Sequence, residues 1–388
     1  MSDFVCPICG NTDTHSIGSL NGKPYCRRCI SFKGEEVEHK TSYPKKAPIN
    51  LSYELSPEQK ELSDKLVENY KAGIDSLVFA VCGSGKTEVS LALIQKVIEQ
   101  GWKVAFAVPR KDVVIELHNR LKNIFRQNKV IALYGGQTKE KTGDLVVLTT
   151  HQLYRYHNYF SLIIMDEIDA FPFKNNDVLK HAFLNSLCGH YVVMSATPSK
   201  EVVQYFQKPG KDILRLEIRF HHHPLPVPQI IIKHKYLLFI CLIRLLRKYV
   251  KNNKPVFIFC PTIEMAESLF SYLRLFLKKG NVVHSKKERR KQIIEAFRNG
   301  FYQFLVTTSV LERGVTVKDL QVIVYHADHE IYDQGTLVQI AGRAGRKKEA
   351  PEGEVIFIAS EKTKAIQGAI DNIKQSNKAL EGDKNELL

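Results

Sequence analysis

No stretch of this sequence is long and apolar enough to span a membrane. The longest apolar run, Tyr236–Ile243, ends at Arg244 and is far shorter than the ~20 residues that a spanning helix needs. The N-terminus also lacks the basic and apolar regions of a secretory signal. We therefore expect a cytoplasmic protein, whose cysteines stay reduced and do not form a disulfide framework.

Acidic residues are scarce relative to basic ones. Asp and Glu total 41 against 56 Lys and Arg, which gives a formal net charge of +15, and no acidic residue occurs between Glu217 and Glu264. This excess favours a polyanionic partner, nucleic acid first and an acidic membrane surface second, with a basic surface kept for solubility as the alternative. Hydrophobic residues make up 44% of the chain, which excludes disorder as its main state.

Four of the eight cysteines form two close pairs near the N-terminus. Two residues separate Cys6 from Cys9, and two separate Cys26 from Cys29. Each pair can point both sulfurs at one ion, so together they complete a tetrahedron of thiolates around Zn2+. Because four protein ligands leave no position for a catalytic water, we expect the zinc to be structural. Free core cysteines and a redox pair are the alternatives.

Beyond residue 55, apolar runs typical of strands alternate with helical patterns. The expected strands are Leu77–Val81, Val104–Val108, Val146–Thr149, Leu162–Met165, Tyr191–Met194, Val256–Cys260, Phe304–Thr307, Val322–Tyr325 and Glu354–Ile358. This alternation predicts an α/β fold with two parallel-sheet lobes in tandem, preceded by the small four-cysteine zinc module. The expected parts are a zinc module (1–40), a linker (41–55), a first lobe (56–215), a connector (216–236), a second lobe (237–375) and a polar tail (376–388).

The strongest chemical signal is the run Ala80-Val81-Cys82-Gly83-Ser84-Gly85-Lys86-Thr87, which follows the first expected strand and opens a helix. It matches the Walker A pattern, with alanine in place of the first glycine. Backbone N–H groups of such a loop, here those of Gly83, Ser84 and Gly85, converge on the phosphates of ATP. We expect Lys86 to reach the β- and γ-phosphates and Thr87 to bind Mg2+.

Two carboxylates end another expected strand. Asp166 and Glu167 follow Leu162–Met165, at the sheet edge where α/β folds bind their ligands. We expect Asp166 to hold Mg2+ through water and Glu167 to orient the water that attacks ATP. A strand that ends in Asp-Glu is common by itself, and the phosphate loop about 80 residues upstream makes this one specific.

These motifs resemble those of the superfamily 2 helicases and translocases, whose two RecA-like lobes hold ATP between them. Asp166–Asp169 is similar to the DEAD-type box, Ser195–Thr197 to the motif that couples ATP state to nucleic-acid binding, and Gln339–Arg346 to the QxxGRxGR motif. The resemblance implies that Gln339 faces the hydrolytic water, while Arg343 and Arg346 stabilise the transition state.

The same resemblance gives further residues a role. Gln59 is similar to the glutamine that recognises adenine, and Ser56, Pro57 and Gln59 also predict a capping box at the start of a helix. Val108–Arg110 and Thr307–Val315 are similar to motifs that bind the nucleic-acid backbone. Both stretches are therefore candidates for contacts with a nucleic acid.

Within the superfamily, a four-cysteine module directly ahead of a two-lobe motor resembles the ComFA family of late competence proteins. This implies an ATP-dependent motor for transforming single-stranded DNA at the cytoplasmic face of the cell membrane. It also implies the membrane DNA channel and the competence protein ComFC as partners. The PriA replication-restart helicases have similar motifs, but carry their zinc cysteines within the second lobe. A zinc-bearing DNA-binding adaptor with a vestigial ATPase is the alternative from another class.

Overall fold

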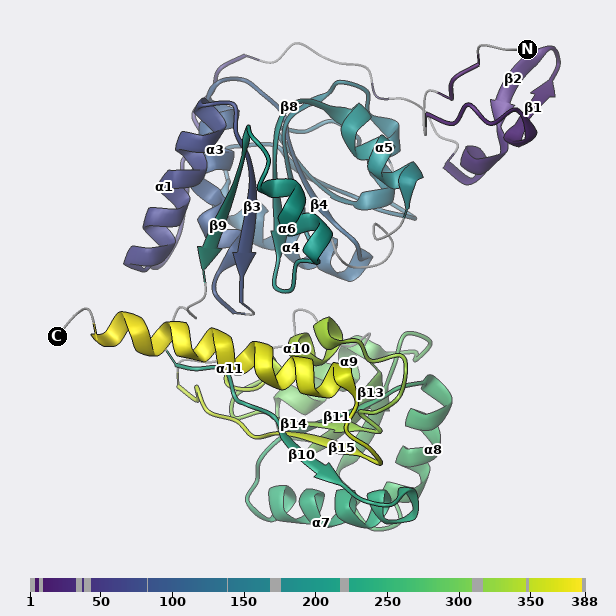
Figure 1. Cartoon of the computed structure of the whole chain (residues 1–388), viewed down its shortest axis with the longest axis vertical. Helices are drawn as coiled ribbons and strands as arrows, with labels where there is room; N and C mark the ends of the chain where they lie inside the picture. The colour runs from purple at the N-terminus through teal and green to yellow at the C-terminus, as the bar shows by residue number, and fades with distance from the viewer. Residues whose placement is uncertain are drawn as a thin grey trace. The chain divides into compact units, whose positions relative to one another are not determined.

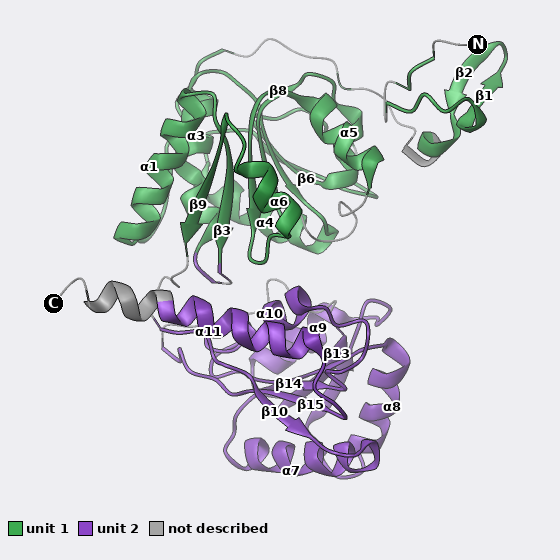
Figure 2. Ribbon diagram, in the orientation of Figure 1, with its two compact units in different colours: residues 1–80, 85–216 green, residues 81–84, 217–388 purple. Residues whose placement is uncertain are grey.

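The structure is a computed structural model. It describes residues 4–6, 10–32, 37, 43–81, 83–137, 139–167, 176–216, 223–308, 317–346 and 349–385, without the side chains of 30–32 and 379–385. The chain forms two compact units, residues 1–80 with 85–216 and residues 81–84 with 217–388 (Figure 1, Figure 2). Each unit contains one large parallel sheet, in agreement with the sequence pattern.

The sheet of the first unit has seven strands in the order β5-β6-β4-β7-β8-β3-β9. They are β3 (Asp75–Ala80), β4 (Val104–Val108), β5 (Val130–Leu133), β6 (Leu145–Thr149), β7 (Phe160–Asp166), β8 (Leu187–Ser195) and β9 (Lys211–Leu216). All neighbouring strands are parallel, and β4 and β6 are buried along their whole length. Such strands are apolar on both faces because helices cover both faces.

The helices of the first unit form two apolar cores. α1 (Pro57–Lys71), α2 (Lys86–Val89), α3 (Leu91–Glu99) and α4 (Lys111–Ile124) contribute to one core, and η3 (Thr150–Arg155), α5 (Asp177–Ser186) and α6 (Lys200–Phe206) to the other. Successive residues of β4 alternate between them, since Phe106 lies in the first core and Ala107 in the second. The predicted capping box is confirmed at α1, where Gln59 N–H donates to Ser56 Oγ and Ser56 N–H donates to Gln59 Oε1.

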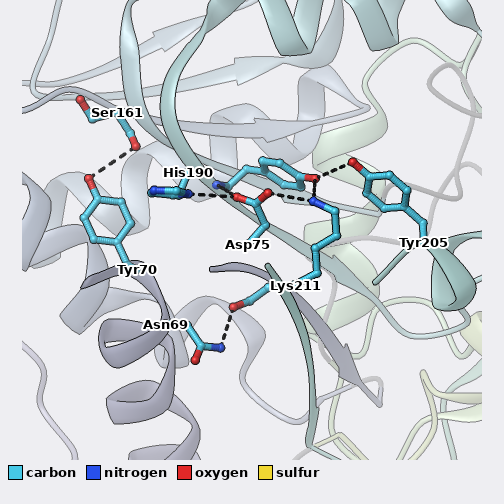
Figure 3. Close-up of polar contacts among 9 residues, drawn as sticks. Asn69, Tyr70, Asp75, Ser161, His190, Tyr205 and Lys211 are labelled. Carbon is cyan, nitrogen blue, oxygen red and sulfur yellow. Dashed lines mark hydrogen bonds and ion pairs between the residues drawn. The ribbon is translucent and has the colours of Figure 1, made fainter. Parts of the chain in front are cut away.

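An ion-pair cluster joins the first residues of β3 and β9 to the middle of β8 (Figure 3). It lies at the end of β3 opposite the one that leads into the phosphate loop. Lys211 Nζ donates to Asp75 Oδ2 at 3.0 Å and to Tyr191 OH at 3.2 Å, and His190 Nδ1 lies 3.3 Å from Asp75 Oδ1. Burial lowers the pKa of Lys211, but the hydrogen bond to Asp75 and its negative charge raise that pKa above its usual value. The cluster thus links the strand that precedes the phosphate loop to both of its neighbours.

The sheet of the second unit has six parallel strands in the order β10-β15-β14-β11-β13-β12. They are β10 (Gln229–Ile232), β11 (Val256–Cys260), β12 (Gly280–Val283), β13 (Phe304–Thr308), β14 (Gln321–Tyr325) and β15 (Val355–Ala359). The helices are α7 (Leu238–Lys251), α8 (Ile263–Leu273), α9 (Arg290–Arg298), α10 (Gln334–Ala341) and α11 (Lys364–Asn385), with a short η4 (Lys235–Leu237). α7 and α8 pack in one apolar core, and α10 and α11 in the other.

Two of these elements lie in stretches that the sequence predicted as the connector and the polar tail. β10 falls within the expected connector 216–236, and α11 continues through residue 385 of the expected tail. Among the helices that the structure describes, none combines the length and apolar character that crossing a membrane requires.

The N-terminal part of the first unit is small. It contains an antiparallel hairpin of β1 (Ile17–Leu20) and β2 (Lys23–Cys26), flanked by the short helices η1 (Thr14–Ser16) and η2 (Arg27–Phe32). The described part of the expected linker packs along the first unit: Ala47 is fully buried, and Lys45 Nζ donates to Asp144 Oδ1 at 2.7 Å.

Candidate active site

The loop between β3 and α2 carries the phosphate-binding motif. Gly83 and Gly85 have φ angles of +86° and +89°, in the left-handed region that favours glycine. A Cβ at Gly85 would also collide with the side chain of Gln59, which is itself buried. Ser84 is fully buried, and its Oγ donates to the carbonyl of Val81 at 2.9 Å. The loop therefore follows a backbone path that requires both glycines.

Lys86 and Thr87 are the first residues of α2, and a buried carboxylate follows them. Glu88 accepts a hydrogen bond from Tyr53 OH at 2.7 Å and forms an ion pair with Arg120 of α4. This triad ties the chain before α1 to the helix that begins at the phosphate loop. Sequence reasoning missed the triad, because its only local signal is an acidic residue directly after Lys86 and Thr87.

Asp166 and Glu167 lie at the carboxyl end of β7, as expected. Asp166 Oδ1 is buried and accepts no hydrogen bond from any residue that the structure describes. Glu167 has a φ of +63°, and its N–H donates to the carbonyl of Met194 at 2.8 Å. Mg2+ prefers oxygen ligands, so a buried carboxylate oxygen without a donor fits a site for this ion. Residues 168 and 169 of the DEAD-type box lie outside the described residues.

Other motif residues lie at the same edge, because the carboxyl ends of parallel strands meet there. Ser195 ends β8, and its Oγ accepts a hydrogen bond from Thr197 N–H at 3.0 Å. Arg110 follows β4, and His151 follows β6, the strand beside it. Burial lowers the pKa of Arg110, against the opposing effect of Asp112, and burial also lowers the pKa of His151. The carboxyl edge of the first sheet therefore carries both the motifs that are expected to bind ATP and candidate contacts for a nucleic acid.

The remaining predicted catalytic residues belong to the second unit. Gln339 lies in α10, and Arg343 and Arg346 lie in the turn that follows it. Arg343 is 4% exposed, whereas Arg346 is half-buried and its Nε donates to the carbonyl of Gly342 at 3.0 Å. Of Thr307–Val315, only Thr307 and Thr308 are described, and both are buried at the end of β13.

The N-terminal cysteines converge. The sulfurs of Cys6, Cys26 and Cys29 all lie within 4.8 Å of one another, and the Sγ atoms of Cys6 and Cys29 are 3.9 Å apart. Zn–S bonds of about 2.3 Å at tetrahedral angles place two sulfurs about 3.8 Å apart. The three buried thiols therefore fit a zinc ion. Cys9, the fourth predicted ligand, lies outside the described residues.

Comparison with known proteins assigns the chain to a family. Residues 52–200 match the family model of the type III restriction enzyme res subunit, and residues 238–348 match the helicase conserved C-terminal domain. The competence protein ComFA of Bacillus subtilis strain 168 is 34% identical over 398 residues, covering 96% of this chain and 86% of that protein. The chain belongs to the ComFA family. The ComFA of Streptococcus pneumoniae R6 is 33% identical over 97% of this chain and 90% of its own length.

The motifs resembled both the ComFA and the PriA families, and this match decides in favour of ComFA. The chain is thus a superfamily 2 helicase-like ATPase. Among solved structures, Saccharomyces cerevisiae Dbp5 bound to RNA and ADP BeF3 has a TM-score of 0.64 with 17% identity, and the match covers 83% of this chain and 91% of Dbp5. This likeness concerns the fold alone and identifies the two sheets as RecA-like lobes.

Proposed function

We propose that the protein is an ATP-dependent single-stranded DNA translocase that drives import of transforming DNA into the cytoplasm. The observation that carries the proposal is the carboxyl edge of the first sheet. There the phosphate loop has its two left-handed glycines, and the buried Oδ1 of Asp166 accepts no hydrogen bond from the described residues. Both features occur in a chain that matches ComFA over 96% of its length. The substrate class, transforming DNA, comes from membership of the family.

In the proposed ATP chemistry, the loop Gly83–Gly85 and Lys86 bind the phosphates, while Gln59 recognises the base. Thr87 and Asp166 hold Mg2+, which neutralises charge that develops on the phosphates. Glu167 orients the attacking water. Gln339, Arg343 and Arg346 act from the second lobe, so hydrolysis requires the lobes to close around ATP.

The proposed DNA contacts are independent of sequence. Arg110 and His151 lie at the ends of adjacent strands β4 and β6, and a stretch without acidic residues separates Glu217 from Glu264. Basic surfaces of this kind bind phosphates and lose affinity as salt rises. From its membership of the family, we also propose that the protein acts at the cytoplasmic face of the membrane, with the DNA channel and ComFC as partners. Structural Zn2+ would be held by Cys6, Cys9, Cys26 and Cys29.

ATP hydrolysis by the purified chain, titrated with single-stranded DNA, duplex DNA and RNA, tests this function. We expect single-stranded DNA to stimulate hydrolysis most strongly, with stimulation that falls as salt increases. Active separation of duplex strands at a replication fork would favour a PriA-like restart helicase instead. DNA binding without hydrolysis, in a chain that retains its zinc, would favour the adaptor with a vestigial ATPase.

A further inference from the structure

The cysteine cluster borders on a helix of the first lobe. Phe4 and Val178 both pack against the buried thiols of Cys6, Cys26 and Cys29. Val178 lies in the first turn of α5, so a helix about 150 residues further along the chain supplies part of the apolar wall of this cluster. Apolar surroundings of a metal site control its access to water, and therefore influence how firmly the ion is held.

His181 lies against the turn that follows Cys6. Residues three apart are neighbours on a helix surface, so His181 and Val178 share one face of α5. A Cβ added to Gly10 would lie 2.8 Å from both Cε1 and Nδ1 of the His181 ring. Gly10 has a φ of +66°, and its N–H donates to the carbonyl of Cys6 at 2.8 Å. Glycine is thus required here both for the turn and for the close approach of His181.

The other face of α5 is fixed in the lobe. Leu179 and Phe183 are buried in one of the two apolar cores of the first unit. Asn176 caps the helix, because its side-chain oxygen accepts a hydrogen bond from Leu179 N–H at 3.1 Å. In the chain, α5 lies between Glu167 and Ser195, two residues of the candidate active site. The helix therefore contacts the cysteine cluster on one side and the core of the ATP-binding lobe on the other.

The N-terminal part contacts the lobe a second time at Val37, after the last cysteine of the cluster. Val37 N–H donates to the carbonyl of Arg155 at 2.9 Å, and Val37 pairs with Tyr156 in a parallel bridge. Val37 also packs against the core that contains Phe183. The N-terminal part thus contacts the lobe at two points, at Gly10 between Cys6 and Cys26 and at Val37 after the last cysteine.

We propose that α5 is part of the metal centre. His181 is a positioning residue that acts through Gly10, and Val178 closes the apolar wall beside the thiols. Metal binding and the packing of α5 are then thermodynamically coupled, so each stabilises the other. This inference rests on the proposal that the cysteines hold zinc, and adds that the ion stabilises an element of the motor lobe itself.

The test uses the full chain with His181→Ala, Val178→Ala and a control, Leu184→Ala. Leu184 also belongs to α5, but it is 57% exposed and is not among the residues packed against the cysteines. Zinc affinity is measured by competition with a chromophoric chelator, and hydrogen exchange of residues 177–186 is measured with and without zinc. We expect the first two variants to bind zinc about tenfold more weakly or worse, the usual scale of losses around a metal site, and the control to match the wild type.

In the wild type, removal of zinc should accelerate hydrogen exchange within α5 at least about fivefold, and this effect should shrink in His181→Ala because the link is already weakened. Circular dichroism and thermal unfolding show whether each variant is folded. If His181→Ala does not fold, Val178→Ala alone tests the inference. Unchanged zinc affinity in both variants, with exchange of α5 independent of zinc, overturns the inference and leaves the zinc assignment intact. A wild-type chain that binds no zinc overturns the assignment and the inference together.

Discussion

The backbone N–H of Glu167 donates to the carbonyl of Met194 at 2.8 Å. This bond joins the end of β7 to β8 directly before Ser195, the first residue of the motif that is predicted to couple ATP state to nucleic-acid binding. Glu167 has a φ of +63°, a conformation that costs free energy for any residue except glycine. The hydrogen bond to β8 compensates for part of that cost, so the orientation of the Glu167 side chain depends on β8.

Glu167→Gln should bind ATP and Mg2+ but hydrolyse ATP at least about a hundredfold more slowly, because the amide cannot act as a base toward water. Glutamine has the same length and leaves the backbone bond to Met194 in place. Binding of a fluorescent ATP analogue and single-turnover hydrolysis separate the two effects. Near-normal turnover in the variant would remove Glu167 from the chemical step.

Gly85→Ala should abolish ATP binding, since it adds both strain at a positive φ and a clash with Gln59. Gly210→Ala is the matched control, because Gly210 has a φ of +77° but a Cβ added there would meet no atom of the described residues within 4 Å. The control should lose only about 1 kcal/mol of unfolding free energy, the cost of a left-handed alanine, and should keep its ATP affinity. Equal ATP affinity in both variants would contradict the assigned role of the loop.

Arg346→Ala should lower hydrolysis by a factor of roughly 10³ or more, the effect of a missing transition-state arginine. Single-stranded DNA should stimulate the residual activity hardly at all, because the DNA acts by favouring the closed lobes that bring this arginine to ATP. Arg298→Ala removes the same charge from α9 and should retain full stimulation. Equal fold-stimulation of Arg346→Ala and wild type by DNA would exclude Arg346 as the coupled residue.

Stability at acid pH should depend on Asp144. Burial raises the pKa of this carboxyl, but the hydrogen bonds from Lys45 and Lys129 N–H and the charge of Lys103 outweigh burial and hold the pKa below its usual value. Because the pKa of Asp144 is lower in the folded than in the unfolded protein, its ionised carboxylate stabilises the fold at pH values above the unfolded-state pKa of about 4. This stabilisation is lost as the pH falls through the folded-state pKa.

Asp144→Asn should therefore lower the unfolding free energy at pH 7 by about 2 kcal/mol, the value of a charged hydrogen bond, with a smaller loss below pH 4. Urea unfolding at several pH values measures both quantities. An equal loss at pH 7 and pH 3 would show that the charge of Asp144 contributes nothing to stability.

The strands that can be predicted from the sequence are those with continuous apolar runs. β4 (Val104–Val108) and β11 (Val256–Cys260) lie at the predicted residues, because five buried apolar positions in succession are recognisable without tertiary information. β9 (Lys211–Leu216) is not among the predicted strands, because charged residues interrupt its apolar pattern and its pairing with β3 supplies the missing stabilisation. The four residues of β10 and of β12 are too short to identify against a loop.

In the candidate active site, too, features that are local in sequence could be predicted and features that depend on distant residues could not. The phosphate loop and the Asp166-Glu167 pair are contiguous motifs, so their position at the carboxyl edge of a parallel sheet could be deduced from the strands before them. The triad of Tyr53, Glu88 and Arg120 and the contact of His181 with Gly10 join residues far apart in sequence. Such pairings have no local signal and emerge only from the folded chain.

Movement along single-stranded DNA is the most direct test of the proposed motor. Streptavidin bound to a biotin at one end of a DNA strand dissociates faster when a translocase reaches it. We predict that wild type accelerates this release, from one strand end only, when ATP is present. A non-hydrolysable ATP analogue and Glu167→Gln should both fail to accelerate release. Robust DNA-stimulated hydrolysis without accelerated release from either end would contradict the account, because ATP would then be consumed without movement.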